Sequence, residues 1–184
     1  MKLVIISDLH DNLVNLKKCL DWCATAGTAA MLFAGDLTNE KTLDYLAKNF
    51  SGKIYLVRGN VDNYDENLLK NYSQIINLTR SGGAIEIGGR NIGLCHEPYL
   101  ISDLLEQKTE IIFYGHTHKP WSSYAPYNAA SLKKQKASED KIEERDEVKL
   151  VNSGTLGGMF QKATFAVYDT ASNELGLKIL DELK

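Results

Sequence analysis

Short apolar runs, each followed by a polar cluster, recur along the 184-residue chain. Near-continuous apolar runs of this length are typical of β-strands that are covered on both faces. The pattern predicts strands at residues 3–6, 30–34, 54–57, 92–95, 111–114 and 149–151, and a closing pair of strands at residues 164–168 and 175–180.

Helical patterns lie between several of these strands, at residues 13–26, 41–49, 66–72 and 99–107. In the first of them, Leu13, Leu16, Leu20 and Cys23 fall on one stripe. Asp11 and Asn12 are the candidate caps at its start, and Gly27 marks its end. Residues 85–95 predict a β-hairpin that turns at the Gly88-Gly89 pair. The alternation of strands and helices therefore predicts an α/β sandwich with helices outside the sheets.

Residues 133–149 do not follow this pattern, because twelve of these seventeen residues are charged. Such a composition is typical of a solvated excursion or a flexible loop, and a lid over a site or an oligomer contact are the alternatives. We expect a single domain over residues 1–184, with a charged surface insertion at about residues 123–149.

Composition narrows the classes of partner. A formal net charge of −3 and a pI near 5.8 argue against a surface for duplex nucleic acid. Apolar runs stay short of the roughly 20 residues of a membrane span, and the start of the chain turns polar too early for a signal peptide. We therefore expect a cytoplasmic protein without a membrane partner, whose three cysteines are buried, reduced thiols.

The candidate chemistry gathers where the predicted strands end, at the edge where α/β sheets bind ligands. The polar residues at these positions include all four histidines of the chain and are Asp8, His10, Asp36, Arg58, Asn60, Asp62, His96, His116 and His118. Taken singly, Asp8-Leu9-His10, Gly35-Asp36 and Gly59-Asn60 are also compatible with ordinary turns. Their order and spacing together favour a metal site.

The residue types indicate which ions such a site prefers. Imidazole and carboxylate together suit Mn, Fe, Zn or Co better than Ca or Mg. The seven candidate ligands are Asp8, His10, Asp36, Asn60, His96, His116 and His118. They suffice for two ions with four protein ligands each if one carboxylate bridges the pair.

In these motifs the chain resembles the calcineurin-like metallophosphoesterase superfamily, and within it the small single-domain bacterial and archaeal phosphodiesterases. The family signature is Asp-x-His, Gly-Asp, Gly-Asn-x-Asp/Glu, a later histidine and Gly-His-x-His. In this chain, Asp8 and His10 match the first motif, Asp36 the second, and Asn60 and Asp62 the third. His96 is the later histidine, and His116 and His118 match Gly-His-x-His. Asn152-Ser153-Gly154-Thr155 also resembles the Asn-Pro-Gly-Ser turn of these enzymes. The resemblance implies a two-sheet αββα sandwich.

The resemblance also implies a mechanism. One ion would take Asp8, His10, Asp36 and His118, and the other Asp36, Asn60, His96 and His116, with Asp36 as the bridge. Both ions would be divalent transition metals, manganese first, with nickel, iron, zinc or cobalt as alternatives. A hydroxide that bridges them would attack phosphorus in line, and Asp36, Asn60 and Arg58 are the expected catalytic residues, Arg58 as a phosphate contact or a structural ion pair.

Two positions depart from the family pattern. Val61 follows Asn60 where related protein phosphatases have a histidine that protonates the leaving group. The sequence His96-Glu97-Pro98-Tyr99 replaces a familiar His-Gly-His. Without the proton donor, rates would fall by roughly 10² to 10⁴-fold for poor leaving groups, which disfavours a phosphoprotein phosphatase.

The leading expectation is hydrolysis of a small or nucleotide-like phosphodiester by a monomer or small homo-oligomer. Two alternatives remain: a nuclease on single-stranded nucleic acid, and a non-catalytic protein-binding scaffold of the same fold, like the retromer subunit of this superfamily. Loss of activity on substituting Asp36 separates an enzyme from a scaffold. Salt-sensitive binding to single-stranded nucleic acid would favour the nuclease.

Overall fold

The computed structural model of the protein describes residues 1–126 and 147–183. Its strands are β1 (Lys2–Ile6), β2 (Ala30–Ala34), β3 (Lys53–Val57), β4 (Ile75–Asn77), β5 (Gly83–Ile87), β6 (Arg90–Leu94), β7 (Ile111–Tyr114), β8 (Trp121–Pro126), β9 (Glu147–Asn152), β10 (Thr164–Asp169) and β11 (Glu174–Ile179). Its α-helices are α1 (Leu13–Ala26), α2 (Glu40–Asn49) and α3 (Ile101–Leu105). Short 3₁₀ helices span Glu66–Asn71, Pro98–Leu100 and Leu180–Glu182.

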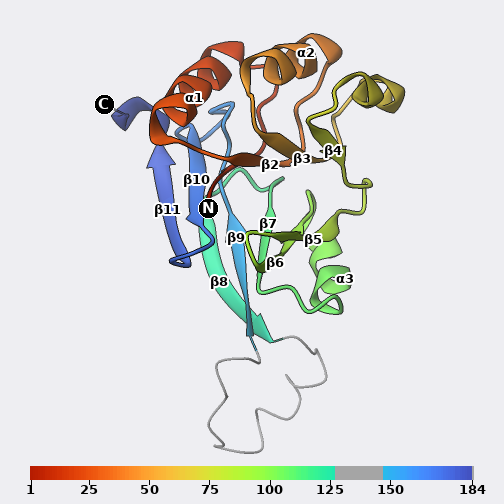
Figure 1. The fold of residues 1–184 in the computed structure, drawn as a ribbon, viewed down its shortest axis with the longest axis vertical. Helices are drawn as coiled ribbons and strands as arrows, with labels where there is room; N and C mark the ends of the chain where they lie inside the picture. The colour runs from red at the N-terminus through yellow and green to blue at the C-terminus, as the bar shows by residue number, and fades with distance from the viewer. Residues whose placement is uncertain (127–146, 184) are drawn as a thin grey trace, which may run out of the picture.

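The strands form two sheets that face each other. The six-stranded sheet has the order β11-β10-β1-β2-β3-β4, and the five-stranded sheet has the order β5-β6-β7-β9-β8. Helices α1 and α2 cover the outer face of the first sheet, and α3 lies on the outer side of the second (Figure 1). This arrangement confirms the predicted two-sheet αββα sandwich.

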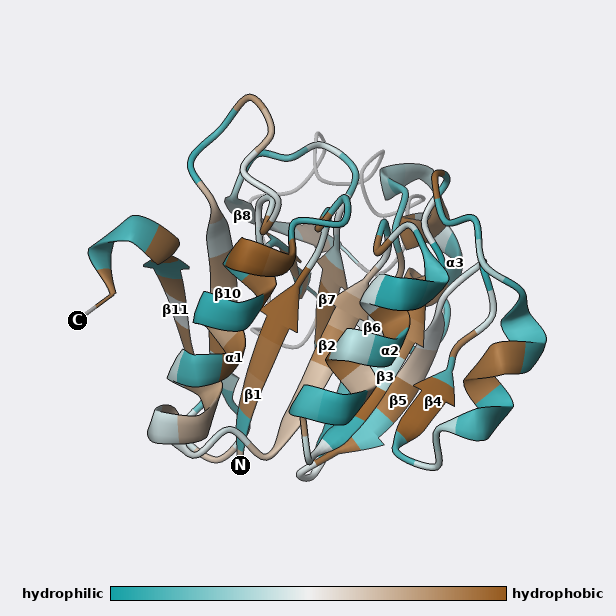
Figure 2. Cartoon of the chain, turned by 90° about the horizontal axis from the view of Figure 1, so that it is seen from above, coloured by the Kyte–Doolittle hydropathy of each residue, from teal (hydrophilic) through white to brown (hydrophobic). Residues whose placement is uncertain are grey.

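Alternate residues of the central strands explain the four layers. On β1, Val4 and Ile6 pack in the cluster beneath α1 and α2, whereas Leu3 and Ile5 pack in the cluster between the two sheets. All four of these side chains are fully buried. The near-continuous apolar run of β1, brown in Figure 2, therefore reflects burial on both faces of its sheet.

The ends of α1 follow the sequence signals. The side chain of Asn12 accepts a hydrogen bond from the Asn15 amide at 3.1 Å, and Gly27 closes the helix in a left-handed conformation with φ of 66°. The predicted hairpin also forms, since Ile87 and Arg90 pair across Gly88 and Gly89, both with positive φ.

Two predicted helices are shorter or different in type. Residues 66–71 form a 3₁₀ helix that buries only Leu69, so they lack the apolar stripe that would support an α-helix. The helix expected at residues 99–107 divides into a 3₁₀ turn that begins at Pro98 and the short α3.

Both ends of the expected insertion at residues 123–149 are β-strands. β8 and β9 pair antiparallel from Trp121 opposite Asn152 to Pro126 opposite Glu147, so residues 123–126 and 147–149 belong to the second sheet. The rest of that segment, residues 127–146, lies outside the described residues.

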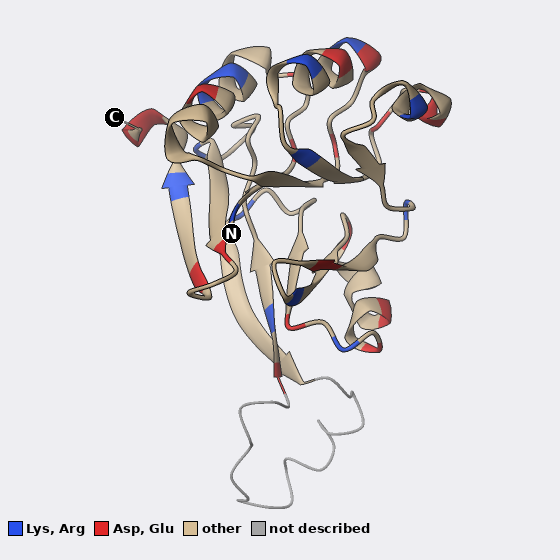
Figure 3. Ribbon diagram, in the orientation of Figure 1, with Lys and Arg blue, Asp and Glu red and all other residues tan. Residues whose placement is uncertain are grey.

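Most charged residues of the described ranges lie on helices, on loops and at the ends of strands (Figure 3). Over the same ranges, no helix combines the length and the apolar character that crossing a membrane requires.

Candidate metal centre

Parallel strands from both sheets bring the candidate ligands to one edge of the sandwich. β1, β2 and β3 run parallel in the first sheet, and β6, β7 and β9 run parallel in the second. Five of the seven predicted ligands have a positive φ, between 48° and 69°; they are Asp8, His10, Asp36, His116 and His118. Backbone in this region is unfavourable for residues other than glycine, and such positions cluster at functional sites.

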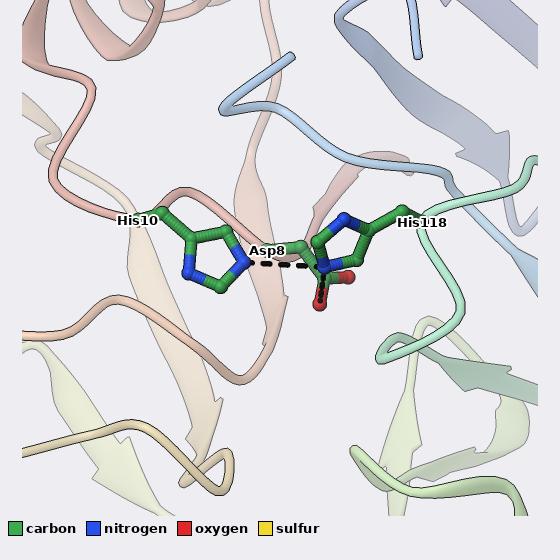
Figure 4. A group of neighbouring side chains, drawn as sticks. All are labelled: Asp8, His10 and His118. Atoms are coloured by element: carbon green, nitrogen blue, oxygen red, sulfur yellow. Dashed lines mark hydrogen bonds and ion pairs between the residues drawn. The ribbon is translucent and has the colours of Figure 1, made fainter. Parts of the chain in front are cut away.

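Asp8, His10 and His118 form the first group of donors (Figure 4). His118 Nε2 lies 3.3 Å from Asp8 Oδ1 and 3.2 Å from His10 Nε2. The figure shows the two imidazole rings turned toward each other above the buried carboxylate of Asp8. Three donor atoms thus converge from two loops that are more than 100 residues apart in sequence.

Asn60, His96 and His116 form the second group. Asn60 Oδ1 lies 3.0 Å from His96 Nε2 and 3.0 Å from His116 Nδ1. His96 Nδ1 donates to the Ala34 carbonyl at 2.7 Å, which leaves its Nε2 as the nitrogen that faces the site. A hydrogen bond of this kind is how proteins commonly orient a histidine that binds a metal.

Asp36 lies between the two groups. Its Oδ2 is 3.3 Å from His96 Nε2 of the second group and 3.9 Å from His10 Nε2 of the first. Donor atoms of Asp8, Asp36 and His96 also lie within 4.8 Å of one another. The structure therefore brings all seven predicted ligands together, with Asp36 between the two groups.

Glycines precede three of these residues because side chains leave no room for a Cβ atom. A Cβ at Gly59 would lie 2.0 Å from Asp36 Oδ1, and one at Gly115 would lie 2.9 Å from Asp8 Oδ2. At Gly35, which has φ of 88°, it would lie 2.5 Å from His96 Nδ1. The Gly-Asp, Gly-Asn and Gly-His pairs in the sequence thus have a steric cause.

Neighbouring polar groups hold the ligands in place. Ser7 Oγ donates to Asp8 Oδ2, and the His116 amide lies 3.1 Å from both oxygens of that carboxylate. Asp62 accepts from the amides of Gly59 and Thr38 at 2.8 and 2.6 Å, and so joins the loops after β3 and β2. Ser7 could not be predicted from the sequence, because one hydroxyl at the end of an apolar run carries no pattern.

The turn at residues 152–155 completes the support of this edge. Asn152 Nδ2 donates to the Gly115 carbonyl at 2.7 Å, next to His116. Thr155 Oγ1 donates to the Asp8 carbonyl at 2.8 Å. The resemblance of residues 152–155 to the family's Asn-Pro-Gly-Ser turn therefore corresponds to contacts with both ligand loops.

The guanidinium group of Arg58 contacts three neighbouring residues. Its Nη1 donates to Glu66 Oε1 at 3.1 Å, and its Nη2 donates to the Asp62 carbonyl at 2.8 Å. The guanidinium carbon lies 4.8 Å from the ring centroid of Tyr64. These contacts are those of a structural ion pair, and a substrate contact would compete with them.

Glu97 is buried, and its Oε2 has no hydrogen-bond partner in the part of the chain that the structure describes.

Burial and mutual charge shift the titration of the site. Burial raises the pKa of Asp8, an effect that the Ser7 hydrogen bond opposes. Burial alone would also raise the pKa of Asp36, but its hydrogen bond and ion pair with His96 hold it below the ordinary value. Burial lowers the pKa of His96, but the hydrogen bond and negative charge of Asp36 have the larger effect and raise it to about 9.

This donor set fits divalent transition metals. It mixes four imidazoles with two carboxylates and one amide oxygen, which suits Mn, Fe, Co, Ni or Zn better than Ca or Mg. Two buried carboxylates that lie so close together require positive charge to remain ionised. Among the described residues of the site, His96 can supply it, because its pKa is raised to about 9 beside Asp36.

Comparison with known proteins agrees with this description. The model of the calcineurin-like phosphoesterase superfamily domain matches residues 1–173. Among curated proteins, no sequence matches the chain.

Several solved structures share the fold. An archaeal phosphodiesterase has a TM-score of 0.75 at 20% identity, over 97% of this chain and 99% of that one. YfcE, a phosphoesterase from E. coli, has a TM-score of 0.56 at 16% identity, over 98% and 100% of the two chains. Vps29 from Entamoeba histolytica, in complex with Zn²⁺, has a TM-score of 0.61 at 18% identity, over 96% and 90%. On the match over residues 1–173, the chain belongs to the calcineurin-like phosphoesterase superfamily.

Proposed function

We propose that the protein is a hydrolase of phosphodiesters, small or nucleotide-like, that works with two divalent transition-metal ions, manganese first. The observation that carries the proposal is the position of Asp36. Its carboxylate is within 4 Å of a histidine from each group of donors, as a ligand shared by two ions requires.

The proposed ligands of one ion are Asp8, His10, Asp36 and His118, and those of the other are Asp36, Asn60, His96 and His116. When bound, such ions supply Lewis acidity toward phosphoryl oxygens and lower the pKa of a water molecule. The chain contributes the fixed positions of the ligands. His96 is held by the Ala34 carbonyl, and Asn60 Oδ1 is aimed between two imidazoles, so little reorganisation is needed.

The surroundings of Asn60 favour substrates with good leaving groups. The side chain of the next residue, Val61, cannot protonate a leaving group. The Val61 amide donates a hydrogen bond to Asp36 Oδ1 at 3.1 Å. Arg58, the candidate phosphate contact near this loop, already donates hydrogen bonds to Glu66 and to the Asp62 carbonyl. We propose that Arg58 positions the loop after β3, and a role in binding phosphate is the alternative.

A non-catalytic scaffold is the second candidate, because Vps29 structures share this fold. Two observations support a built metal site, which the enzyme requires. The donor atoms converge, and the supporting hydrogen bonds of Ser7, Asp62 and Asn152 act on the ligand loops. We also propose a single domain, a cytoplasmic location and a monomer or small homo-oligomer.

The test is hydrolysis of bis(p-nitrophenyl) phosphate and p-nitrophenyl phosphate by metal-stripped protein after addition of Mn²⁺, Ni²⁺, Zn²⁺ or Mg²⁺. We expect metal-restored cleavage of the diester, and a loss of roughly a hundredfold or more in Asp36→Asn. The exposed Asp103→Asn on α3 is the matched control and keeps full activity. Absence of turnover with every metal would favour the scaffold, and faster cleavage of the monoester would contradict diester specificity.

A further inference from the structure

Exposed apolar side chains lie close in sequence to the candidate ligands. Ten large hydrophobic residues of the described ranges are exposed, and five of these lie within four residues of a candidate ligand: Leu13, Val14, Val61, Tyr99 and Trp121. Two more, Met159 and Phe160, lie in the loop before β10, which contacts Ser7 and Asp8. Apolar surface gathered beside a site marks contact with a partner or ligand more often than chance.

Phe160 is the most exposed of these residues, at 89% of its full surface. It also has φ of 62°, a conformation that is unfavourable for a bulky side chain. Packing does not explain this choice of residue, because an exposed ring adds almost nothing to the core. An aromatic ring in a strained position at the surface is instead typical of a contact with a ligand.

The loop that carries Phe160 is joined directly to the metal centre. The amides of Leu156 and Gly157 donate to the carbonyls of Ser7 and Asp8, both at 2.9 Å. A Cβ at Gly157 would lie 2.9 Å from the Asp8 carbonyl oxygen, which indicates how closely the backbones approach. Phe160 follows Gly157 by three residues, so its Cα lies on the order of 11 Å or less from that contact.

The first turn of α1 holds the other side of the loop. Asn12 Nδ2 donates to the Gly157 carbonyl at 2.9 Å, and Asn15 Nδ2 donates to the Leu156 carbonyl at 2.8 Å. In Figure 2 the loop that leads into β10 projects beyond the strand ends, and its tip is brown. Phe160 therefore extends from a loop whose base is held by hydrogen bonds to Ser7, Asp8 and the first turn of α1.

We propose that Phe160, with Met159 beside it, is the platform that binds a flat aromatic group of the substrate, as a nucleobase or phenyl ester provides. This inference rests on the proposed function and deepens it. It predicts a phosphodiester with an aromatic substituent on one side of the phosphorus. Stacking on an exposed aromatic ring requires no base-specific hydrogen bonds, so the platform selects for aromatic character and not for one particular base.

The test is direct binding, measured by calorimetry on the Zn²⁺-supplemented protein with phenylphosphonate and methylphosphonate. Both ligands carry the same anionic group on a carbon–phosphorus bond that hydrolysis does not cleave, and they differ in the ring. We expect phenylphosphonate to bind more tightly, and Phe160→Ala to weaken it about tenfold while methylphosphonate is unaffected. Phe160→Tyr keeps the preference. Tyr124→Ala on β8, an exposed aromatic residue away from this loop, is the matched control and changes neither affinity.

Equal affinity for the two phosphonates, or an equal effect of Phe160→Ala on both, would overturn the platform. The result is distinguishable from failure of the proposed function. A ring preference that depends on Phe160 in a protein without hydrolase activity would support the platform and refute the enzyme. Metal-restored hydrolysis without a ring preference would refute the platform and leave the enzyme standing.

Discussion

At the scale of single residues, Gly59 tests how tightly the ligands are packed. A Cβ at this position would lie 2.0 Å from Asp36 Oδ1 and 2.4 Å from the Asp36 amide nitrogen. Gly59→Ala must therefore displace the carboxylate that the two donor groups share. We expect metal affinity to fall about 10- to 100-fold, as for lost support of a ligand. We expect the free energy of unfolding to fall by about 1–3 kcal/mol, as for an overpacked core.

Gly176→Ala is the matched control, because a Cβ at Gly176 meets nothing within 4 Å and its φ is not positive. Metal titration and urea unfolding of both variants check the prediction. Wild-type metal affinity in Gly59→Ala would show that the Asp36 carboxylate does not depend on this packing.

The seven candidate ligands were predictable from sequence because each follows an apolar run at a strand end, and the structure brings them together. The residues that hold these ligands in place were harder to predict from sequence. Ser7 hydrogen-bonds Asp8 without any distinctive spacing, and the partners of Arg58 depend on how residues 62–66 fold back. The exposure of apolar residues such as Met159 and Phe160 could not be predicted from sequence either, because exposure is a property of the fold.

At the scale of elements, the contact between α1 and the loop before β10 is open to a paired test. Asn12 and Asn39 both cap helices, each accepting from an amide three residues on at 3.1 Å. Asn12 alone of the two also donates to the Gly157 carbonyl. We expect Asn39→Ala to lower the free energy of unfolding by about 1 kcal/mol, the value of a helix cap. We expect about 2 kcal/mol for Asn12→Ala, because it loses the cap and the hydrogen bond to Gly157.

Hydrogen exchange then separates the two variants. The amides of Leu156 and Gly157 exchange about fivefold faster in Asn12→Ala, the equivalent of roughly 1 kcal/mol for one hydrogen bond, and are unchanged in Asn39→Ala. The same exchange in both variants would contradict a specific role of Asn12 in holding the loop.

Elements with strong local signals were predictable, and those defined by their neighbours were not. The buried strands of both sheets and the Gly88-Gly89 hairpin follow from apolar runs and a turn pair. β8 was missed because residues 121–126 are mostly exposed or half-buried and lie at an edge of the sheet, so they lack an apolar run. The helix at residues 66–72 was expected in the wrong form, since its 3₁₀ geometry reflects a shallow contact through Leu69.

At the scale of the whole molecule, we expect the proposed metal binding to be coupled to protonation. In the metal-free chain the pKa of His96 is raised to about 9, mainly by Asp36 against the effect of burial. His96 is therefore protonated at pH 7.5, and it must lose that proton to bind a metal. We expect release of about one proton as the metal binds, and a metal affinity that rises with pH until about pH 9.

Calorimetry in buffers of different ionisation enthalpy measures this release. The apparent binding enthalpy then varies with the buffer at pH 7.5, and it varies less above pH 10, where His96 is already neutral. An enthalpy independent of buffer at pH 7.5 would mean that His96 is neutral in the metal-free protein or takes no part in binding.

The number of bound ions tests the central claim most directly. Metal-stripped protein is dialysed against Mn²⁺, the bound metal is counted, and the electron paramagnetic resonance spectrum is recorded. The two donor groups that share Asp36 predict two ions per chain with a spin-coupled spectrum, and Asp36→Asn is expected to abolish the coupling. One ion per chain, or two ions without coupling, would contradict a dinuclear centre built on Asp36.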